Sequence, residues 1–356
     1  MYTTKPLSLF KSNREAAAEL PLDGPNAGYL VVKAAADEED DETTCWGTTR
    51  RVLELPFPQN RVLRVDHGED SEYVVFVSVA GHPLSSNRYY AVIASGKHKG
   101  LLWACPREED MTMCCWCQCI NDVDPRPFDP ADVYLQIEIV QHRRGLFTAR
   151  AIAADGLPPS IFRLNHWDVY EFKNIDLGQA PGLDAVHRSR RLAGDAIPGT
   201  KTAVGKWYCP FFAIKEHGVP PREQMGRGAV YAVVLEQRWE PVRVDTDSRL
   251  ASKKVLIGGS VEAKSEVGSS RSGDAYVWFV AETGHARVGV CTTVWERMLW
   301  EQNRGGWVDE EEDAGDVADG SVVLVERFEV KRMDGSVVVA FDFVHHNKVT
   351  EEQYGA

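Results

Sequence analysis

The sequence predicts an α+β protein, predominantly antiparallel β, with two β-rich lobes and few short helices. Short runs rich in β-branched and aromatic residues recur along the chain, and several of them alternate with polar residues, which is typical of strands. Asp334 and Gly335 separate two such runs, and this dipeptide strongly favours a tight hairpin turn. The chain shows no regular alternation of strand and helix patterns, which argues against a doubly wound parallel sheet.

The first lobe is predicted to span residues 1–195. A short helix is expected at 15–19. Clusters of Pro and Gly then bound the alternating runs, and the last two runs are close enough in sequence to form a hairpin. Strands are predicted at 29–33, 62–65, 73–80, 89–94, 133–140 and 146–153.

The second lobe is predicted to span residues 196–356. The segment 193–206 is rich in Gly, Thr and Ala, and it is the best candidate for a linker between the lobes. Residues 294–303 fit a short helix better than a strand. Strands are predicted at 207–215, 229–244, 253–267, 275–281, 287–294, 322–333 and 336–344, the last two flanking the Asp-Gly turn.

The 356 residues carry a formal net charge of −13, which two short runs account for. Residues 37–42 hold six acidic side chains and residues 309–319 hold seven, so the rest of the chain is neutral overall. Runs of like charge repel themselves and favour solvated loops. Nucleic acids and anionic membranes carry the same sign of charge, so we expect no nucleic-acid partner and do not favour a membrane partner.

Signals for export and anchoring are missing from the sequence. The first 25 residues lack the apolar core of a secretory signal, and no apolar run approaches the 18 or so residues of a membrane-spanning helix. The eight cysteines are therefore expected to be reduced thiols. We expect a cytoplasmic protein, with the nucleus as the second compartment.

Four cysteines fall within six residues, at Cys114, Cys115, Cys117 and Cys119. In a strand, the last three share one face, and either Cys105 or His98 is close enough in sequence to join them. Because four thiolates can hold a structural zinc ion, Cys105, Cys115, Cys117 and Cys119 form a candidate zinc site. The spacing does not match a standard zinc motif, so buried small hydrophobic residues and a reactive thiol remain as alternatives.

A second candidate site is the segment 96–100, whose sequence is Gly-Lys-His-Lys-Gly. Basic side chains on a glycine-flanked turn can hold an anion together with backbone N–H groups. We expect Arg88, Lys97, His98 and Lys99 to take part. The alternative is an ordinary hairpin turn with its lysines in solvent.

No catalytic residue is predicted. The chain lacks a Walker A loop, a nucleophile elbow, an HExxH zinc motif and a glycine-rich dinucleotide loop. Trp207, Tyr208, Phe211 and Phe212 fit a ligand groove, although core packing is the preferred interpretation. Residues 258–273 fit a hairpin that inserts into a membrane as part of a β-barrel pore, although a solvent-facing hairpin is preferred.

Several long segments carry a family resemblance. They include MYTTKPLSLFK, PLSSNRYYAVIASGKHKG and CCWCQC in the first half, and GKWYCPFFAIKE, WERMLWEQNRGGW and ERFEVKRMDGS in the second. Together they resemble one plant family of uncharacterised proteins, catalogued as domain of unknown function 1262, from residue 1 to about residue 346. The resemblance implies a plant source, and it implies no reaction, catalytic residue or cofactor.

The leading hypothesis is a non-enzymatic intracellular protein that binds a protein partner or a small molecule, and the resemblance adds a role in stress or defence responses. One alternative is a pore-forming-toxin-like β protein that acts on membranes through its second lobe. Another is an enzyme with a Cys/His site or a protein stabilised by zinc. The position of the cysteines in the fold discriminates the first hypothesis from the last.

Overall fold

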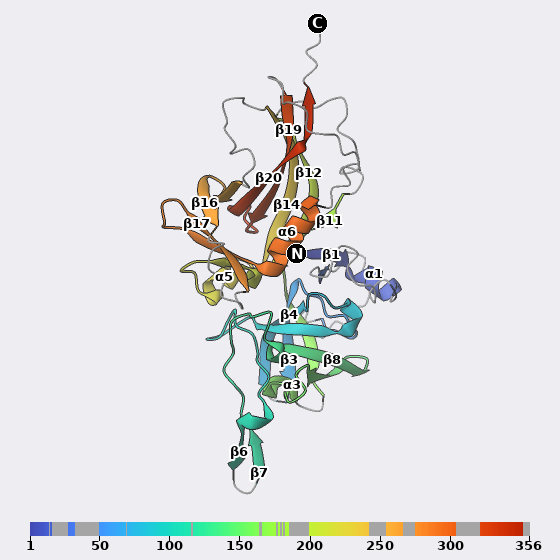
Figure 1. Cartoon of the computed structure of the whole chain (residues 1–356). Helices are drawn as coiled ribbons and strands as arrows, with labels where there is room; N and C mark the ends of the chain where they lie inside the picture. The colour runs from blue at the N-terminus through green and yellow to red at the C-terminus, as the bar shows by residue number, and fades with distance from the viewer. Residues whose placement is uncertain are drawn as a thin grey trace.

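The protein is mostly β-sheet with few short helices, and its sheets are mostly antiparallel, which confirms the predicted class at this level. In the computed structural model the molecule is elongated, with a large sheet toward the C-terminal end and a smaller sheet next to it (Figure 1). The described residues are 1–13, 15, 28–32, 50–68, 70–114, 117–163, 166–175, 177–178, 180, 182–184, 199–241, 254–265, 275–303 and 321–351.

The larger sheet has twelve strands in the order β13-β18-β17-β16-β15-β20-β19-β14-β12-β1-β2, and β11 also pairs with β12. Strands β1 and β2 form a parallel pair, whereas the other pairs among the described strands are antiparallel. The strands are β1 (Tyr2–Pro6), β2 (Gly28–Val32), β11 (Gly182–Leu183), β12 (Lys201–Pro210), β13 (Ile214–Glu216), β14 (Val230–Pro241), β15 (Lys254–Ile257), β16 (Val261–Ser265), β17 (Tyr276–Ala281), β18 (Arg287–Cys291), β19 (Ser321–Lys331) and β20 (Val337–Glu351).

The smaller sheet has six strands in the order β10-β3-β4-β5-β8-β9, and a separate two-stranded hairpin, β6–β7, extends from it (Figure 1). The strands are β3 (Arg61–His67), β4 (Asp70–Ser78), β5 (Arg88–Ile93), β6 (Met111–Cys114), β7 (Cys117–Ile120), β8 (Gln136–Arg143), β9 (Leu146–Ala151) and β10 (Asp168–Asn174). The helices are α1 (Leu7–Ser12), α3 (Ser160–Arg163), α5 (Pro221–Arg227) and α6 (Thr292–Asn303), with short 3-10 turns η2 (Leu84–Ser86), η3 (Glu108–Asp110), η4 (Val133–Leu135) and η5 (Phe211–Ala213).

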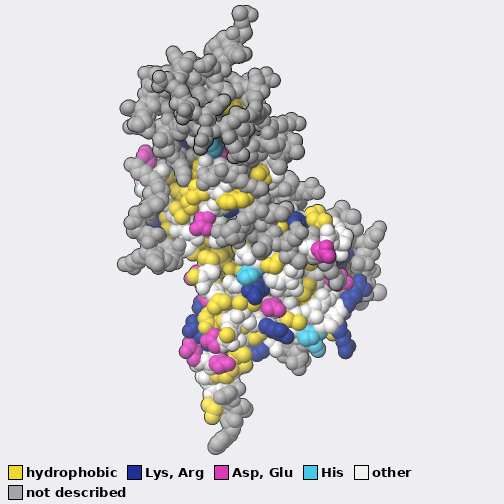
Figure 2. Space-filling model, turned by 45° about the vertical axis from the view of Figure 1, so that its right-hand side comes forward, with side chains coloured by type: hydrophobic (Ala, Val, Ile, Leu, Met, Phe, Trp, Pro, Cys, Tyr) yellow, Lys and Arg dark blue, Asp and Glu magenta, His cyan; other side chains and the backbone are white. Residues whose placement is uncertain are grey.

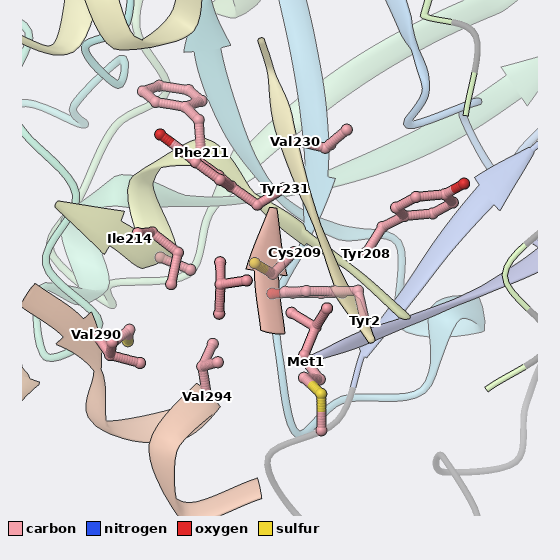
Figure 3. Close-up of a cluster of buried hydrophobic side chains, with 14 of the residues drawn as sticks. Met1, Tyr2, Tyr208, Cys209, Phe211, Ile214, Val230, Tyr231, Val290 and Val294 are labelled. Atoms are coloured by element: carbon pink, nitrogen blue, oxygen red, sulfur yellow. The ribbon is translucent and has the colours of Figure 1, made fainter. Parts of the chain in front are cut away.

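The main hydrophobic core contains side chains from both sheets. It is centred where β1, β12, β13, β14, β18 and α6 converge, and Figure 3 shows Met1, Tyr2, Cys209 and Val294 there. Successive side chains of a strand point to opposite faces, so β4 and β5 contribute to two cores. Val75 and Tyr90 belong to the main core, and Phe76 and Tyr89 belong to the core of the smaller sheet.

The structure confirms two local predictions and corrects a third. The Asp334-Gly335 turn joins β19 to β20, and α6 covers the segment where a helix was preferred. The predicted linker is wrong from Lys201 onward, because β12 begins there. Gly205 reflects close packing and not flexibility, since a Cβ at this position would lie 2.5 Å from the Trp207 ring.

Two predictions fall outside the described residues. The helix at 15–19 is described only at residue 15, and the predicted boundary between lobes near residue 195 lies in an undescribed segment. The division into two lobes therefore remains a prediction.

Candidate functional site

A cavity of about 670 Å³ opens beside strand β8 in the smaller sheet. Four segments that are distant in sequence line it. They are the end of α1, residues 54–56, residues 84–87 around η2, and residues 138–144 at the end of β8.

The cavity exists because β5 and β8 stop pairing before β8 ends. Their register pairs Arg88 with Glu138, and one further backbone bond runs from Ile139 N–H to Asn87 O at 2.9 Å. Asn87 has a left-handed backbone (φ 50°), which turns the chain into η2 and away from β8. The last residues of β8 then have β9 on one side and the cavity on the other.

The opposite wall is fixed by the side chain of Gln141. Its Nε2 donates to Leu53 O at 2.8 Å, and its Oε1 accepts from Leu55 N–H at 3.3 Å. Gly145 N–H also donates to Leu53 O at 2.8 Å. These bonds hold residues 53–55 alongside the β8–β9 turn without forming a strand pair.

Basic side chains outnumber acidic ones around this cavity. Lys11, Arg143 and Arg144 line it together with Glu54 and Glu138. Arg144 lies 3.9 Å from Glu54, and because both are exposed this pair is weak. Lys11 and Arg143 are exposed and form no ion pair with another described residue.

A second cavity of about 80 Å³ continues from the first and extends the basic surface. It shares Lys11, Glu54 and Arg144 with the larger cavity, and the charged residues that it adds are Arg50, Arg51 and Glu171. Arg51 is paired with Asp168 at 2.7 Å. Figure 2 shows dark blue basic side chains along the right-hand side of the lower half, the side on which Figure 1 places α1 and β8.

Two neighbouring side chains hold the ring of His142 at the cavity. His142 Nε2 is 2.8 Å from the Thr148 hydroxyl on β9, and its ring makes an edge contact with the His166 ring at 5.5 Å. Ser85, which lines the cavity, forms no hydrogen bond to His142 among the described contacts. The described part of the cavity thus combines charged side chains with hydrogen-bonding groups.

The structure separates the residues of the predicted anion site. Arg88 begins β5, with its Nη1 3.5 Å from His82 Nε2, whereas Lys97, His98 and Lys99 form the turn after the other end of β5. This turn packs on α5, and a Cβ on Gly100 would lie 2.5 Å from Pro221 O. Arg88 therefore does not join the turn, and anion binding by the three turn residues remains a prediction.

The cysteines of the predicted zinc site have different environments. Cys105 is buried in the core of the smaller sheet as a free thiol, and burial raises its pKa to about 12. Cys119, on β7, is disulfide-bonded, which differs from the reduced state expected from the sequence. Cys115 lies outside the described residues, and the side chain of Cys117 is not described. The described residues contain no group of three or more His, Cys, Asp or Glu able to hold a metal ion, and the four-cysteine site remains a prediction.

The aromatic cluster after the predicted linker is core. Trp207, Tyr208, Phe211 and Phe212 are all buried in the main hydrophobic core. In the segment considered for membrane insertion, β16 is paired on both edges, with β15 and β17. In the part of the chain that the structure describes, no helix is both long and apolar enough to cross a membrane.

The family similarity lies in a segment that forms part of the cavity wall. Residues 23–116 match the family model described as "Protein of unknown function (DUF1262)". This match confirms the resemblance over β2 to β6, which includes residues 54–56 and 84–87 of the cavity wall. A plant source and the resemblance beyond residue 116 remain predictions.

Curated proteins and solved structures show less similarity to this chain. No curated protein matches it. Among solved structures, the crystal structure of Cry35Ab1 is similar with a TM-score of 0.39 and 9% sequence identity, over 83% of this chain and 90% of that one.

Sequence reasoning missed the β8 cavity. The sequence contains the basic run His142-Arg143-Arg144, but such a run is typical of a solvated hairpin end. Lys11 is 132 residues away from Arg143 in the chain, and only the fold brings both to one cavity.

Proposed function

We propose that this protein is a non-enzymatic binding protein and that its β8 cavity binds an acidic partner. The observation that carries the proposal is that Lys11 and Arg143 line the same cavity. Both side chains are exposed, and neither forms an ion pair with another described residue. Such cations stay hydrated in the free protein, so they have little desolvation penalty there. They form charge-assisted hydrogen bonds when carboxylates approach.

The local excess of basic side chains at the cavity contrasts with the negative net charge of the whole chain. A protein with a formal net charge of −13 repels acidic molecules at long range. At physiological ionic strength, exposed charges interact only over about 8 Å, so the nearest side chains decide what binds. An acidic partner that binds this protein therefore needs a local basic site, and the cavity supplies one.

The wider biological role comes from the sequence. A role in stress or defence responses is a hypothesis that accompanies the family resemblance, and an intracellular location is a hypothesis from the missing export signals.

The test uses a fluorescein-labelled peptide of eight residues in which Glu and Val alternate. Fluorescence anisotropy is measured for the wild type and for the double variant Lys11→Ala/Arg143→Ala. We expect saturable binding that weakens with added salt, and an affinity about tenfold lower in the double variant.

The control is Lys201→Ala/Arg222→Ala, which removes the same two residue types at exposed positions that do not line either cavity. This variant should bind like the wild type. Absence of saturable binding, or the same affinity in both double variants, would overturn the proposed function.

A further inference from the structure

The β8 cavity follows the edge of a strand and not one of its faces. All residues from Glu138 to Arg144 line it consecutively. Because successive side chains point to opposite faces of a sheet, a cavity over one face would be lined by every second residue. Consecutive lining indicates that the cavity is open to the strand from the side, where its main-chain groups lie.

The ladder pattern shows which main-chain groups face that side. Ile139 N–H donates to Asn87 O, so the main chain of Ile139 is directed away from β9. Val140 is paired with Thr148 on β9, and Gln141 stands opposite Phe147, whose N–H bonds to Trp167 O instead. Main-chain groups alternate between the two sides of a strand, so those of Gln141 lie on the same side as those of Ile139.

No described strand pairs with β8 on this side beyond Glu138. The edge is bounded by Asn87, just before β5 begins, and by residues 53–55 near the β8–β9 turn. The five residues Ile139–Arg143 span roughly 13–17 Å at the usual rise of a strand. A strand edge with which no described strand pairs is a template for another strand.

We propose that the acidic partner binds as an extended peptide segment that adds to the smaller sheet along the β8 edge. In this binding mode, main-chain hydrogen bonds to β8 give affinity, and alternate side chains of the peptide contact neighbouring residues and give specificity. Acidic side chains on one side of the segment approach Lys11 and Arg143, while Leu55, Leu84 and Val140 receive apolar side chains. This inference rests on the proposed function and specifies the form of the partner.

The experiment compares three versions of the labelled Glu-Val peptide with the full-length protein. One is unmodified, one carries N-methyl groups on the amides of its Glu residues, and one carries them on its Val residues. An added strand directs only every second N–H toward β8, so one methylated peptide should lose about tenfold or more in affinity and the other should keep it.

Hydrogen exchange provides a second readout without any substitution in the protein. We expect the unmodified peptide to slow exchange of the Gln141 amide, with no such change when the more weakly binding methylated peptide is added at the same concentration. Equal affinity of the two methylated peptides, with binding still sensitive to Lys11→Ala/Arg143→Ala, would overturn strand addition and leave the proposed function standing. Absence of binding by all three peptides would overturn both.

Discussion

The Arg332 guanidinium donates two hydrogen bonds to the Glu216 carboxylate, including one from Nε to Oε1 at 3.0 Å. Tyr231 Oη donates to the same oxygen at 2.7 Å. Glu216 ends β13, at one edge of the large sheet, whereas Tyr231 lies on β14 and Arg332 directly follows β19. The sheet therefore curls so that its edge strand β13 contacts β14 and the end of β19, which lie near its centre. The hydrogen bonds of Glu216 stabilise this contact.

Replacing Glu216 by Gln should lower the free energy of unfolding by about 2 kcal/mol, because Arg332 loses its charged partner in a largely buried setting. Urea unfolding measures the effect. The matched control is Glu240→Gln, whose carboxylate pairs with Arg238 but is about half exposed (48%), so its cost should stay below about 1 kcal/mol. Equal losses in the two variants would contradict a closing role for Glu216.

Acidification should destabilise the protein through Glu216 and Asp342. Burial alone raises the pKa of each carboxyl, but hydrogen bonds and positive charge outweigh it and hold both pKa values below their usual range. The positive charge near Glu216 comes from Arg332 and Arg227, and that near Asp342 comes from Arg327 and Arg238.

A folded-state pKa below the unfolded value stabilises the protein above a pH of about 4.3, and this stabilisation is lost as the pH falls through the folded-state pKa. Urea unfolding at pH 7 and at pH 3 should therefore show a smaller drop in Glu216→Gln and in Asp342→Asn than in the wild type. An unchanged drop in both variants would show that these carboxyls do not govern the acid sensitivity.

Cys105 and Cys209 should resist alkylation in the folded protein. Burial raises the pKa of each thiol to about 12, so little reactive thiolate is present at neutral pH, and both side chains are inaccessible. Iodoacetamide treatment followed by peptide mass spectrometry should find both residues unmodified until urea unfolds the chain. Rapid modification of Cys105 in the native protein would instead support the reactive-thiol alternative.

Gly100→Ala should destabilise the protein more than Gly96→Ala. Both glycines have positive φ, at +87° and +74°, so each substitution carries a backbone cost of about 1 kcal/mol. Only at Gly100 does the new Cβ also meet backbone, with Pro221 O at 2.5 Å, whereas nothing lies within 4 Å at Gly96. Melting temperatures of the two variants test whether the basic turn is docked on α5, and equal shifts would argue that it is not.

Local sequence signals predicted many of the strands and the β19–β20 hairpin, but not β1, β10 or β11. β4, β5 and β14 are rich in Val, Phe and Tyr, which favour strands, and the Asp334-Gly335 turn needs only the two residues themselves. These features depend on short-range chemistry, and they appear in the structure close to the expected residues. Gly205 was misread because its neighbour in space, Trp207, acts through packing that composition does not reveal.

The candidate site could not be predicted in the same way. The cavity depends on where β5 stops pairing with β8 and on the Gln141 side chain that holds residues 53–55. Both are relationships between segments more than forty residues apart. The sequence displayed Arg143 and Lys11 as ordinary surface cations, and only the fold gives them a common cavity.

Photo-crosslinking most directly tests the claim that acidic partners bind beside β8. The labelled Glu-Val peptide carries a photoreactive group at its centre, and mass spectrometry locates the crosslinked residues on the full-length protein. The account predicts crosslinks within residues 84–87 and 138–144, reduced in Lys11→Ala/Arg143→Ala. Crosslinks concentrated on Lys97–Lys99 or on the β6–β7 hairpin, and unchanged by that double variant, would contradict it.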